Sequence, residues 1–185
     1  MNIKFTEIQN SSERKQVQEL YNNSVPAHEK AYFYPLWWKR KRPNISFVNI
    51  YDEEKWVGFV FYSIFKDLVY VWFFATNDTA TSKEYDSAMF SELKMLCPNH
   101  RIAVTIEAEN EDSDNAEQST REKQFYENNG FVETGYFVKR KADSFEIMLI
   151  GKSFHIEELY DVNRDVYPIL SRFIISDMKK QIQKK

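Results

Sequence analysis

Three apolar segments follow one another with only short polar gaps between them, and this arrangement constrains the fold more than any other feature. They are Ile45–Tyr51, Trp56–Phe65 and Leu68–Thr76, separated by four residues and then by two. Gaps this short can join neighbouring strands only as antiparallel hairpins. We therefore expect a three-stranded meander. The nearly continuous apolar character of its last two strands predicts that both faces are covered.

The segments after the meander predict one change of strand direction. Tyr85–Leu96 has apolar residues on one helical face, and Arg101–Glu107 has the pattern of the next strand. A strand that reaches the next strand through a helix forms a right-handed parallel crossover. Because ligands of such sheets bind where strand direction switches, the expected site lies between Leu68–Thr76 and Arg101–Glu107.

The rest of the chain completes an α/β (α+β) fold with a mixed, mostly antiparallel sheet of about seven strands flanked by helices. The other expected elements are a strand at Ile3–Ile8, helices at Ser11–Ser24, His28–Arg42 and Asn115–Asn129, and a final hairpin of Phe131–Val138 with Phe145–Ile150. We expect one domain over residues 1–151 and a helical extension over residues 152–185. The extension should bury Leu159, Val162, Val166, Ile169, Leu170 and Phe173. These side chains could pack against the sheet. Alternatively, they could pack against a second copy of the chain in a homodimer.

Composition excludes several classes of function. The 25 basic and 28 acidic residues give a net charge of −3, which disfavours a nucleic-acid partner. The single cysteine, Cys97, cannot form an internal disulfide, so we expect a reducing compartment, the cytoplasm. The three histidines are far apart and have no zinc spacing, so no metal is expected. The longest uncharged apolar stretches are about ten residues, too short to cross a bilayer, so no membrane association is expected.

The end of the predicted helix Asn115–Asn129 has a motif that resembles that of a known protein family. Tyr126 stands four residues before Gly130, which Phe131 follows, so the helix end has a Tyr-x-x-x-Gly-Phe pattern. Together with the segment Asp114–Gln118 and the element order, this pattern resembles the GNAT (GCN5-related) N-acetyltransferases, and the upstream segment is similar to a bacterial subgroup. The resemblance covers about four-fifths of the chain and stops at the C-terminal extension.

The resemblance implies acetyl-CoA as co-substrate and an amine, in a small molecule or a protein, as acceptor. It implies that the backbone of Phe74, Ala75 and Thr76 aligns the pantetheine arm and that Asn115 contacts this arm. Tyr126 matches the position whose hydroxyl protonates the leaving thiolate, and a packed tyrosine at a helix end is the alternative. Glu107 ends the crossover strand and could accept a proton from an ammonium substrate. The alternative is an ordinary solvated acid.

The segment expected to hold the pyrophosphate departs from the family pattern. Members carry Arg/Gln-x-x-Gly-x-Gly/Ala, where this chain has Thr81, Ser82, Lys83, Glu84, Tyr85, Asp86 and Ser87. Glu84 and Asp86 occupy the glycine positions and Thr81 the Arg/Gln position. Glycine lets backbone N–H groups approach a phosphate, whereas carboxylates add bulk and like charge. Acidic residues also suit a helix N-terminus for the ordinary dipole reason.

Three functions follow from these residues. The chain could be an acetyl-CoA-dependent N-acetyltransferase. It could be a GNAT-fold pseudoenzyme with impaired coenzyme A binding that acts as a binding or regulatory module. It could also be a structural subunit whose tail drives self-association.

A basic run, Lys39–Arg42, ends the predicted helix His28–Arg42. Cations at a helix C-terminus need no ligand to explain them. Contact with an acidic partner is the alternative.

Overall fold

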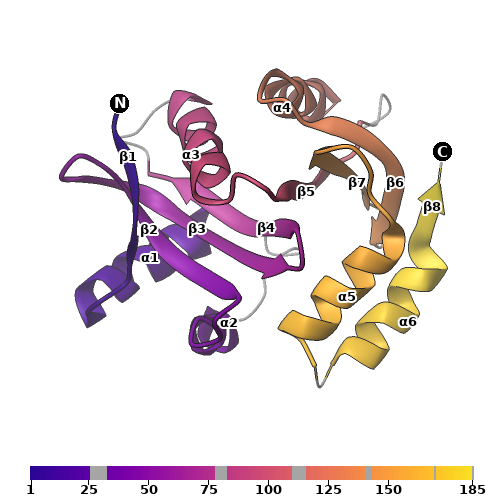
Figure 1. Cartoon of the computed structure of the whole chain (residues 1–185), viewed down its shortest axis with the longest axis horizontal. Coiled ribbons are helices and arrows are strands. Elements are labelled where there is room, and N and C mark those ends of the chain that lie inside the picture. The colour runs from indigo at the N-terminus through magenta and orange to yellow at the C-terminus, as the bar shows by residue number, and fades with distance from the viewer. Residues whose placement is uncertain (26–32, 78–82, 110–115, 141–142, 169, 185) are drawn as a thin grey trace. The chain divides into compact units, whose positions relative to one another are not determined.

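The structure is a computed structural model that describes residues 1–25, 33–77, 83–109, 116–140, 143–168 and 170–184. Its elements, shown in Figure 1, are β1 (Ile3–Glu7), α1 (Ser11–Ser24), α2 (Phe33–Lys39), β2 (Ile45–Asp52), β3 (Lys55–Phe65), β4 (Leu68–Thr76), α3 (Lys83–Leu96), β5 (Arg101–Glu107), α4 (Ala116–Asn128), β6 (Val132–Arg140), β7 (Asp143–Ile150), α5 (Ile156–Val166), α6 (Ser171–Gln181) and β8 (Ile182–Lys184). The strands pair in the order β1-β2-β3-β4-β5-β7-β6-β8.

The predicted crossover is confirmed. Leu68, Val69 and Tyr70 of β4 pair in parallel with Arg101, Ile102 and Ala103 of β5. The other registers described, β1–β2, β2–β3, β5–β7, β6–β7 and β6–β8, are all antiparallel. The expected mixed, mostly antiparallel sheet flanked by helices is therefore the fold of the chain.

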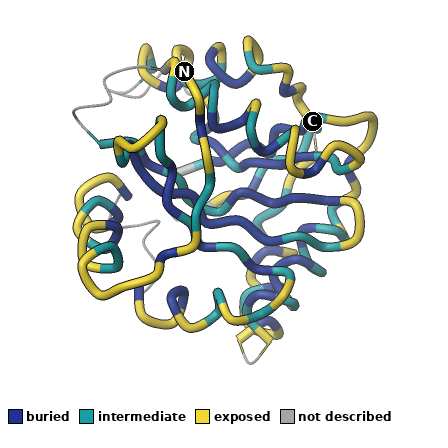
Figure 2. The backbone as a smooth tube through the Cα atoms, turned by 60° about the vertical axis from the view of Figure 1, so that its left-hand side comes forward, coloured by how far each residue is buried: buried dark blue, intermediate teal, exposed yellow. Residues whose placement is uncertain are grey.

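The chain divides into two compact units, and the first comprises residues 1–63 and 71–98. In it, adjacent residues of β4 show which helix covers which face of the sheet. Phe73 makes an edge contact with Tyr21 of α1 at 5.4 Å, whereas Phe74 makes one with Phe90 of α3, also at 5.4 Å. Because neighbouring side chains of a strand point to opposite faces, α1 and α3 cover opposite faces. Figure 2 shows long buried stretches in dark blue; in this unit the buried residues lie mainly in β3 and β4, whereas most of β1 is accessible.

The second unit comprises residues 64–70 and 99–185. Arg101, the first residue of β5, ties three of its segments together. Its guanidinium donates two hydrogen bonds of 2.8 Å to the carboxylate of Asp67, one of 2.6 Å to the carbonyl of Ser153, and two to Glu158 in α5. Paired hydrogen bonds between a guanidinium and a carboxylate fix orientation as well as distance, so this cluster anchors α5 to the start of the parallel strand pair.

The C-terminal extension is helical over α5 and α6, as expected, and it buries Leu159, Val162 and Val166. Within this single chain Leu170 and Phe173 are 55% and 77% exposed, so they do not pack against the sheet, and their burial against a second copy stays a prediction. The buried apolar residues of α6 include Ile175 and Met178. Ile169 lies outside the described residues. The expected sheet of about seven strands has eight, because β8 pairs with Tyr136, Phe137 and Val138 of β6.

Candidate functional site

The end of β4 lies unusually close to β3 in the first unit. A Cβ atom at Gly58 would overlap the carbonyl oxygen of Ala75 and would lie 3.0 Å from the Cα of Thr76. The next residue, Asn77, donates its backbone N–H to the carbonyl of Val57 at 2.8 Å. Only glycine allows this approach, so position 58 fixes the path of the backbone from Ala75 to Asn77.

Asp86, in the first turn of α3, turns its carboxyl toward the end of β4. Thr76 donates its hydroxyl to Asp86 Oδ1 at 3.3 Å. Asp86 keeps some accessible surface, but the surrounding atoms remove most water from its carboxyl, and this raises its pKa from 3.8 to about 6. The Thr76 hydroxyl opposes the shift without cancelling it. Both protonation states of Asp86 are therefore populated between pH 5 and 7.

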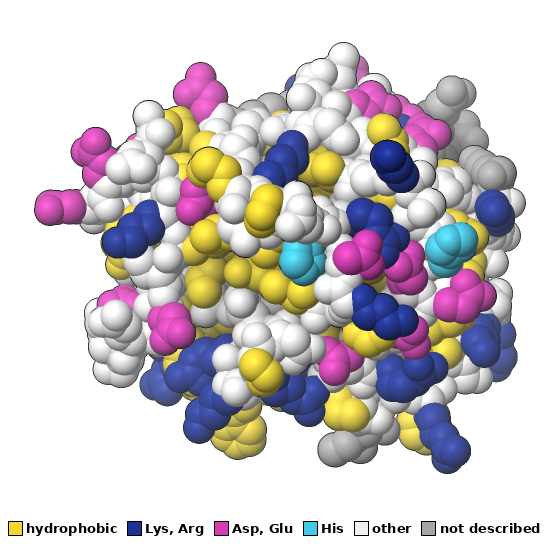
Figure 3. Space-filling model, in the orientation of Figure 1, with side chains coloured by type: hydrophobic (Ala, Val, Ile, Leu, Met, Phe, Trp, Pro, Cys, Tyr) yellow, Lys and Arg dark blue, Asp and Glu magenta, His cyan; other side chains and the backbone are white. Residues whose placement is uncertain are grey.

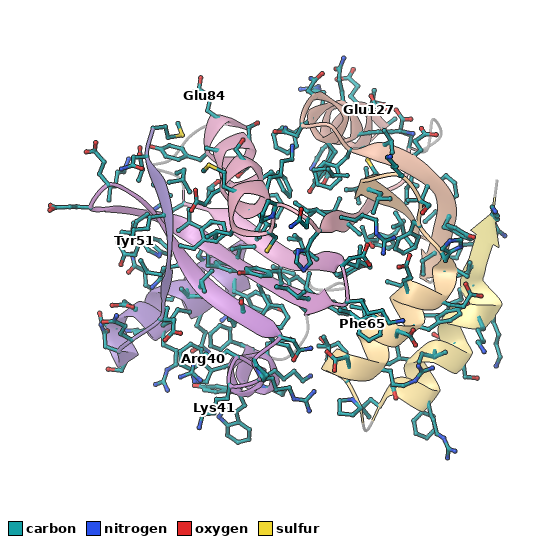
Figure 4. All side chains as sticks on the ribbon, in the orientation of Figure 1. Arg40, Lys41, Tyr51, Phe65, Glu84 and Glu127 are labelled. Carbon is teal, nitrogen blue, oxygen red and sulfur yellow. The ribbon has the colours of Figure 1, made fainter. Side chains whose placement is uncertain are left out.

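The neighbours of Asp86 in α3 have different surroundings. Tyr85 donates its hydroxyl to Asp52 Oδ2 at 3.1 Å, and the other oxygen of Asp52 accepts the backbone N–H of Asn2 at 2.7 Å. The Asn2 bond and, less strongly, the Tyr85 bond lower the pKa of Asp52. Glu84 is exposed, and Figure 4 shows its side chain pointing away from α3 into solvent.

Two other residues of the expected phosphate loop, Lys83 and Ser87, also lie in α3. Lys83 is the first residue of α3, and Ser87 accepts the hydroxyl of Ser91 on its backbone carbonyl at 3.0 Å. Thr81, Ser82 and Asn115 lie outside the described residues. Of the two carboxylates expected in this loop, that of Asp86 contacts the end of β4 through Thr76, whereas Glu84 is exposed.

In the second unit, Tyr126 lies in the last two turns of α4 and is 5% exposed. Its ring makes edge contacts with Phe125 and Phe131 at 5.3 and 5.4 Å. Its backbone carbonyl accepts the N–H of Phe131 at 3.1 Å, which closes the turn after the helix. Glu107 ends β5 opposite Phe145 of β7 and is partly exposed. No hydrogen bond described in this unit joins Glu107 to Tyr126.

A charged cluster that the sequence analysis did not single out attaches α4 to the strands beside it. Lys123 Nζ lies 3.1 Å from Glu146 of β7 and 3.4 Å from Glu109, and it also contacts Glu133 of β6. Glu146 is 1% exposed, and its burial raises its pKa despite the ammonium beside it. The cluster therefore holds a carboxylate that depends on Lys123 to remain charged inside the protein.

Comparison with solved structures identifies the fold. A protein from Bacteroides thetaiotaomicron assigned to the GNAT acetyltransferase family aligns with a TM-score of 0.70 and 21% identity, over 92% of this chain and 98% of its own. An aminoglycoside 6'-N-acetyltransferase in complex with coenzyme A aligns with a TM-score of 0.64 and 13% identity, over 84% and 100% of the two chains. The ribosomal-protein-S18-alanine N-acetyltransferase from Escherichia coli gives 0.56 and 10%, over 83% and 96%.

This chain has the GNAT fold. No protein-family model matches the sequence. No curated protein matches it either. The identity to these three GNAT structures is 21% or less, so the likeness concerns the architecture.

Two site features had a visible signal in the sequence. Gly58 is an isolated glycine inside an apolar strand, a pattern that indicates a bulge or a close backbone approach. Glu146 is a single charge inside the apolar run from Phe145 to Ile150, which indicates a buried carboxylate with a partner. By contrast, the contact of Thr76 with Asp86 had no signal, because it depends on how α3 packs.

Within the described parts of the chain, no group of three or more His, Cys, Asp or Glu side chains is arranged to hold a metal ion. The described helices include none with the length and apolarity needed to cross a membrane.

Proposed function

We propose that this chain is a cytoplasmic GNAT N-acetyltransferase that transfers the acetyl group of acetyl-CoA to an amine in a small molecule or a protein. The observation that best supports the proposal is the parallel pairing of β4 with β5 in a mostly antiparallel sheet. Ligands of mixed sheets bind at such a switch of direction. The similar structures named above are acetyltransferases by their descriptions, and one of them is a complex with coenzyme A.

The reaction needs an uncharged amine and a protonated leaving thiolate. In this proposal Glu107 accepts the proton of the substrate ammonium, directly or through water, and Tyr126 donates its phenolic proton to the sulfur. The peptide groups of Phe74, Ala75 and Thr76 align the pantetheine arm, and Asn115 contacts it. Acetyl-CoA, when bound, supplies the activated acetyl group.

The pyrophosphate of acetyl-CoA would meet the first turn of α3 and the residues before it, Thr81, Ser82, Lys83, Glu84, Tyr85, Asp86 and Ser87. Free backbone N–H groups at a helix start suit an anion. An ionised Asp86 repels it, whereas a protonated Asp86 does not. Exposed Glu84 can turn into solvent, so Asp86 is the residue that limits affinity. A pseudoenzyme that binds a partner instead is the second candidate, and these two carboxylates are the observation that favours it.

A calorimetric titration with acetyl-CoA at pH 7.5 and pH 5.5 tests the proposal. With a pKa of about 6, the protonated fraction of Asp86 rises about 25-fold between these two values. We therefore expect weak binding at pH 7.5 and an affinity up to about 25-fold higher at pH 5.5. Asp86→Asn keeps an oxygen that can accept the Thr76 hydroxyl and should bind with high affinity at both values. Glu84→Gln is the matched control, because it removes the same charge from an exposed position.

The outcomes separate the two candidates. A pH effect that survives unchanged in Asp86→Asn belongs to the ligand or to other residues and refutes the role of Asp86. Binding by Asp86→Asn without acetyl transfer to any of a panel of polyamines, aminoglycosides and peptide amines supports the binding module. Absence of binding by every form at both pH values rejects the transferase proposal.

A second variant tests whether Tyr126 acts as the general acid. Tyr126→Phe keeps the ring that packs on Phe125 and Phe131, so it should melt as the wild type does. Loss of a positioned acid lowers turnover about 100-fold or more, with the affinity for acetyl-CoA unchanged. Unchanged turnover would leave Tyr126 with a packing role alone.

A further inference from the structure

The parallel pairing of β4 with β5 covers only the start of both strands. Within the part of the chain that the structure describes, the register joins residues 68–70 to residues 101–103. Beyond them, β5 continues to Glu107 beside β7. The side of β5 that faces β4 therefore has no partner in this register after Ala103, although the strand itself is held in place by β7.

Tyr70, the last residue of β4 in this register, extends its side chain forward along β5. Its hydroxyl lies 2.5 Å from Oγ1 of Thr105, two residues beyond its own partner Ala103. Every second residue of a strand points to the same face, so Thr105 shares the face of Ala103. Tyr70 is 5% exposed, whereas Thr105 is partly exposed. The two hydroxyls therefore meet where the strands cease to pair.

The chemistry of the two hydroxyls sets the direction of their hydrogen bond. A phenol is a stronger acid than an aliphatic alcohol, so Tyr70 donates and Thr105 accepts. A hydroxyl has one proton and two lone pairs. The O–H of Thr105 is thus left to donate, and among the described residues it has no acceptor. A hydroxyl that accepts one hydrogen bond also donates another more strongly.

Glu107 shares this face of β5. It lies two residues beyond Thr105 and is partly exposed, as Thr105 is, whereas Ile106 between them is 2% exposed. Two residues of a strand span about 7 Å. This span leaves room for an amine nitrogen beside Glu107 and for the carbonyl that it attacks, since reacting atoms approach to about 3 Å. A proton acceptor and a hydrogen-bond donor therefore lie in one row.

The opposite end of this strand pair is occupied by ion pairs. Arg101 lies between the carboxylates of Asp67 and Glu158, and its side chain is 17% exposed. Figure 3 shows acidic and basic side chains next to one another in the region of α5. In this unit, the end of the strand pair that remains for a ligand is the one with Thr105 and Glu107.

We propose that Thr105 is a catalytic residue of the transferase, whose hydroxyl donates a hydrogen bond to the carbonyl oxygen of the acetyl group, and that Tyr70 is the positioning residue that orients this hydroxyl. The inference rests on the proposed function. A donor directed at an oxygen that becomes negative stabilises the transition state more than the ground state.

The step balances without a proton from Thr105. Glu107 takes one proton from the ammonium, and the nitrogen lone pair then forms the C–N bond while an electron pair moves onto the carbonyl oxygen. Thr105 stabilises that oxygen through its hydrogen bond. The pair returns as the C–S bond breaks, and Tyr126 protonates the sulfur. Tyr126 recovers the second proton of the nitrogen through water, and Glu107 releases its proton to solvent.

Variants of the full chain test the donor, with acetyl-CoA at saturation and an amine from the panel named above. Thr105→Val removes the hydroxyl and keeps the shape of the side chain, so turnover should fall about 100-fold with the Kd for acetyl-CoA unchanged. Thr105→Ser keeps the O–H and should retain most of the turnover. Thr134→Val is the matched control, because it removes a partly buried hydroxyl of β6 that donates to the carbonyl of Ile147 at 2.7 Å. Its turnover should match that of the wild type.

A double variant tests the positioning role. Tyr70→Phe should lower turnover less than Thr105→Val, because it keeps the donor and removes only the bond that orients it. Tyr70→Phe combined with Thr105→Val should be as slow as Thr105→Val alone, since Tyr70 acts through the Thr105 hydroxyl. Effects that multiply would give Tyr70 a separate role and reject the positioning.

A vibrational measurement tests the contact without turnover. Infrared difference spectra of bound acetyl-CoA with ¹³C in its carbonyl should show a lower C=O stretching frequency in the wild type and in Thr105→Ser than in Thr105→Val, because a hydrogen bond weakens the C=O bond. Tyr70→Phe should give an intermediate frequency. A structural role of the two hydroxyls predicts the same frequency in every form.

Failure of this inference is distinct from failure of the proposed function. A wild-type chain that neither binds acetyl-CoA nor transfers the acetyl group rejects both. A wild type that transfers it, with Thr105→Val equally fast, overturns the role of Thr105 alone. A loss in Thr134→Val as large as in Thr105→Val would assign the effect to stability and would also overturn it. If Thr105→Val fails to fold, the frequency in Tyr70→Phe decides, and a wild-type value there rejects the proposal.

Discussion

Replacing Asp86 with asparagine should stabilise the protein at neutral pH. The carboxyl lies against the end of β4, accepts the hydroxyl of Thr76, and has its pKa raised from 3.8 to about 6 by loss of water. That rise corresponds to about 3 kcal/mol of free energy by which folding disfavours the charged form, at ~1.36 kcal/mol per pH unit. Loss of a carboxylate from a helix start removes only about 0.3–1 kcal/mol of dipole interaction. The desolvation penalty is the larger effect, so the variant gains stability.

The gain should depend on pH in a defined direction. A raised pKa means that the native state holds the proton more tightly than the unfolded chain does, so the contribution of Asp86 to stability falls as pH rises from about 3.8 to about 6. The expected advantage of Asp86→Asn is therefore about 3 kcal/mol at pH 7.5 and about 1 kcal/mol at pH 4.5, before the dipole loss. Urea denaturation at the two pH values measures the difference, and Glu84→Gln controls for removal of an exposed charge from the same turn. An equal advantage at both values, or none at pH 7.5, would refute the desolvation argument.

Two further substitutions test the packing around the site. Gly58→Ala would place a methyl group against the backbone of Ala75, so we expect a loss of about 1–3 kcal/mol in urea denaturation and weaker acetyl-CoA binding. A wild-type stability would mean that the strands can move apart. Lys123→Met would remove the ammonium that keeps the buried Glu146 charged, and leaving that carboxyl without its partner should cost about 3–5 kcal/mol. Adding Glu146→Gln should restore much of that loss, and purely additive effects would argue against the pairing.

Much of the architecture could be predicted because it depends on local pattern. The short gaps around β3 admit only hairpins, and the helix between β4 and β5 requires a crossover, so both were predictable without tertiary information. β8 was not, because Ile182, Gln183 and Lys184 have no strand pattern of their own. They become a strand by pairing with the edge of β6.

The candidate site was less predictable because, like β8, it depends on tertiary packing. The sequence places Glu84 and Asp86 two residues apart in one helical turn, and nothing in that spacing says which carboxyl is buried. Packing leaves Glu84 exposed and brings Asp86 to Thr76, where loss of water raises the pKa of Asp86. Chemistry that depends on desolvation requires the tertiary structure.

The pairing of β8 with β6 also bears on how the chain is made. During synthesis from the N-terminus, β6 can pair with β7 as soon as residue 150 has emerged, but its other edge stays open until Ile182–Lys184 appear. An open strand edge is a template for pairing with a neighbouring nascent chain. The edge therefore stays unprotected until residues 182–184 have left the ribosome, and deletion of Ile182–Lys184 should affect yield and aggregation during expression more than the stability of protein already folded.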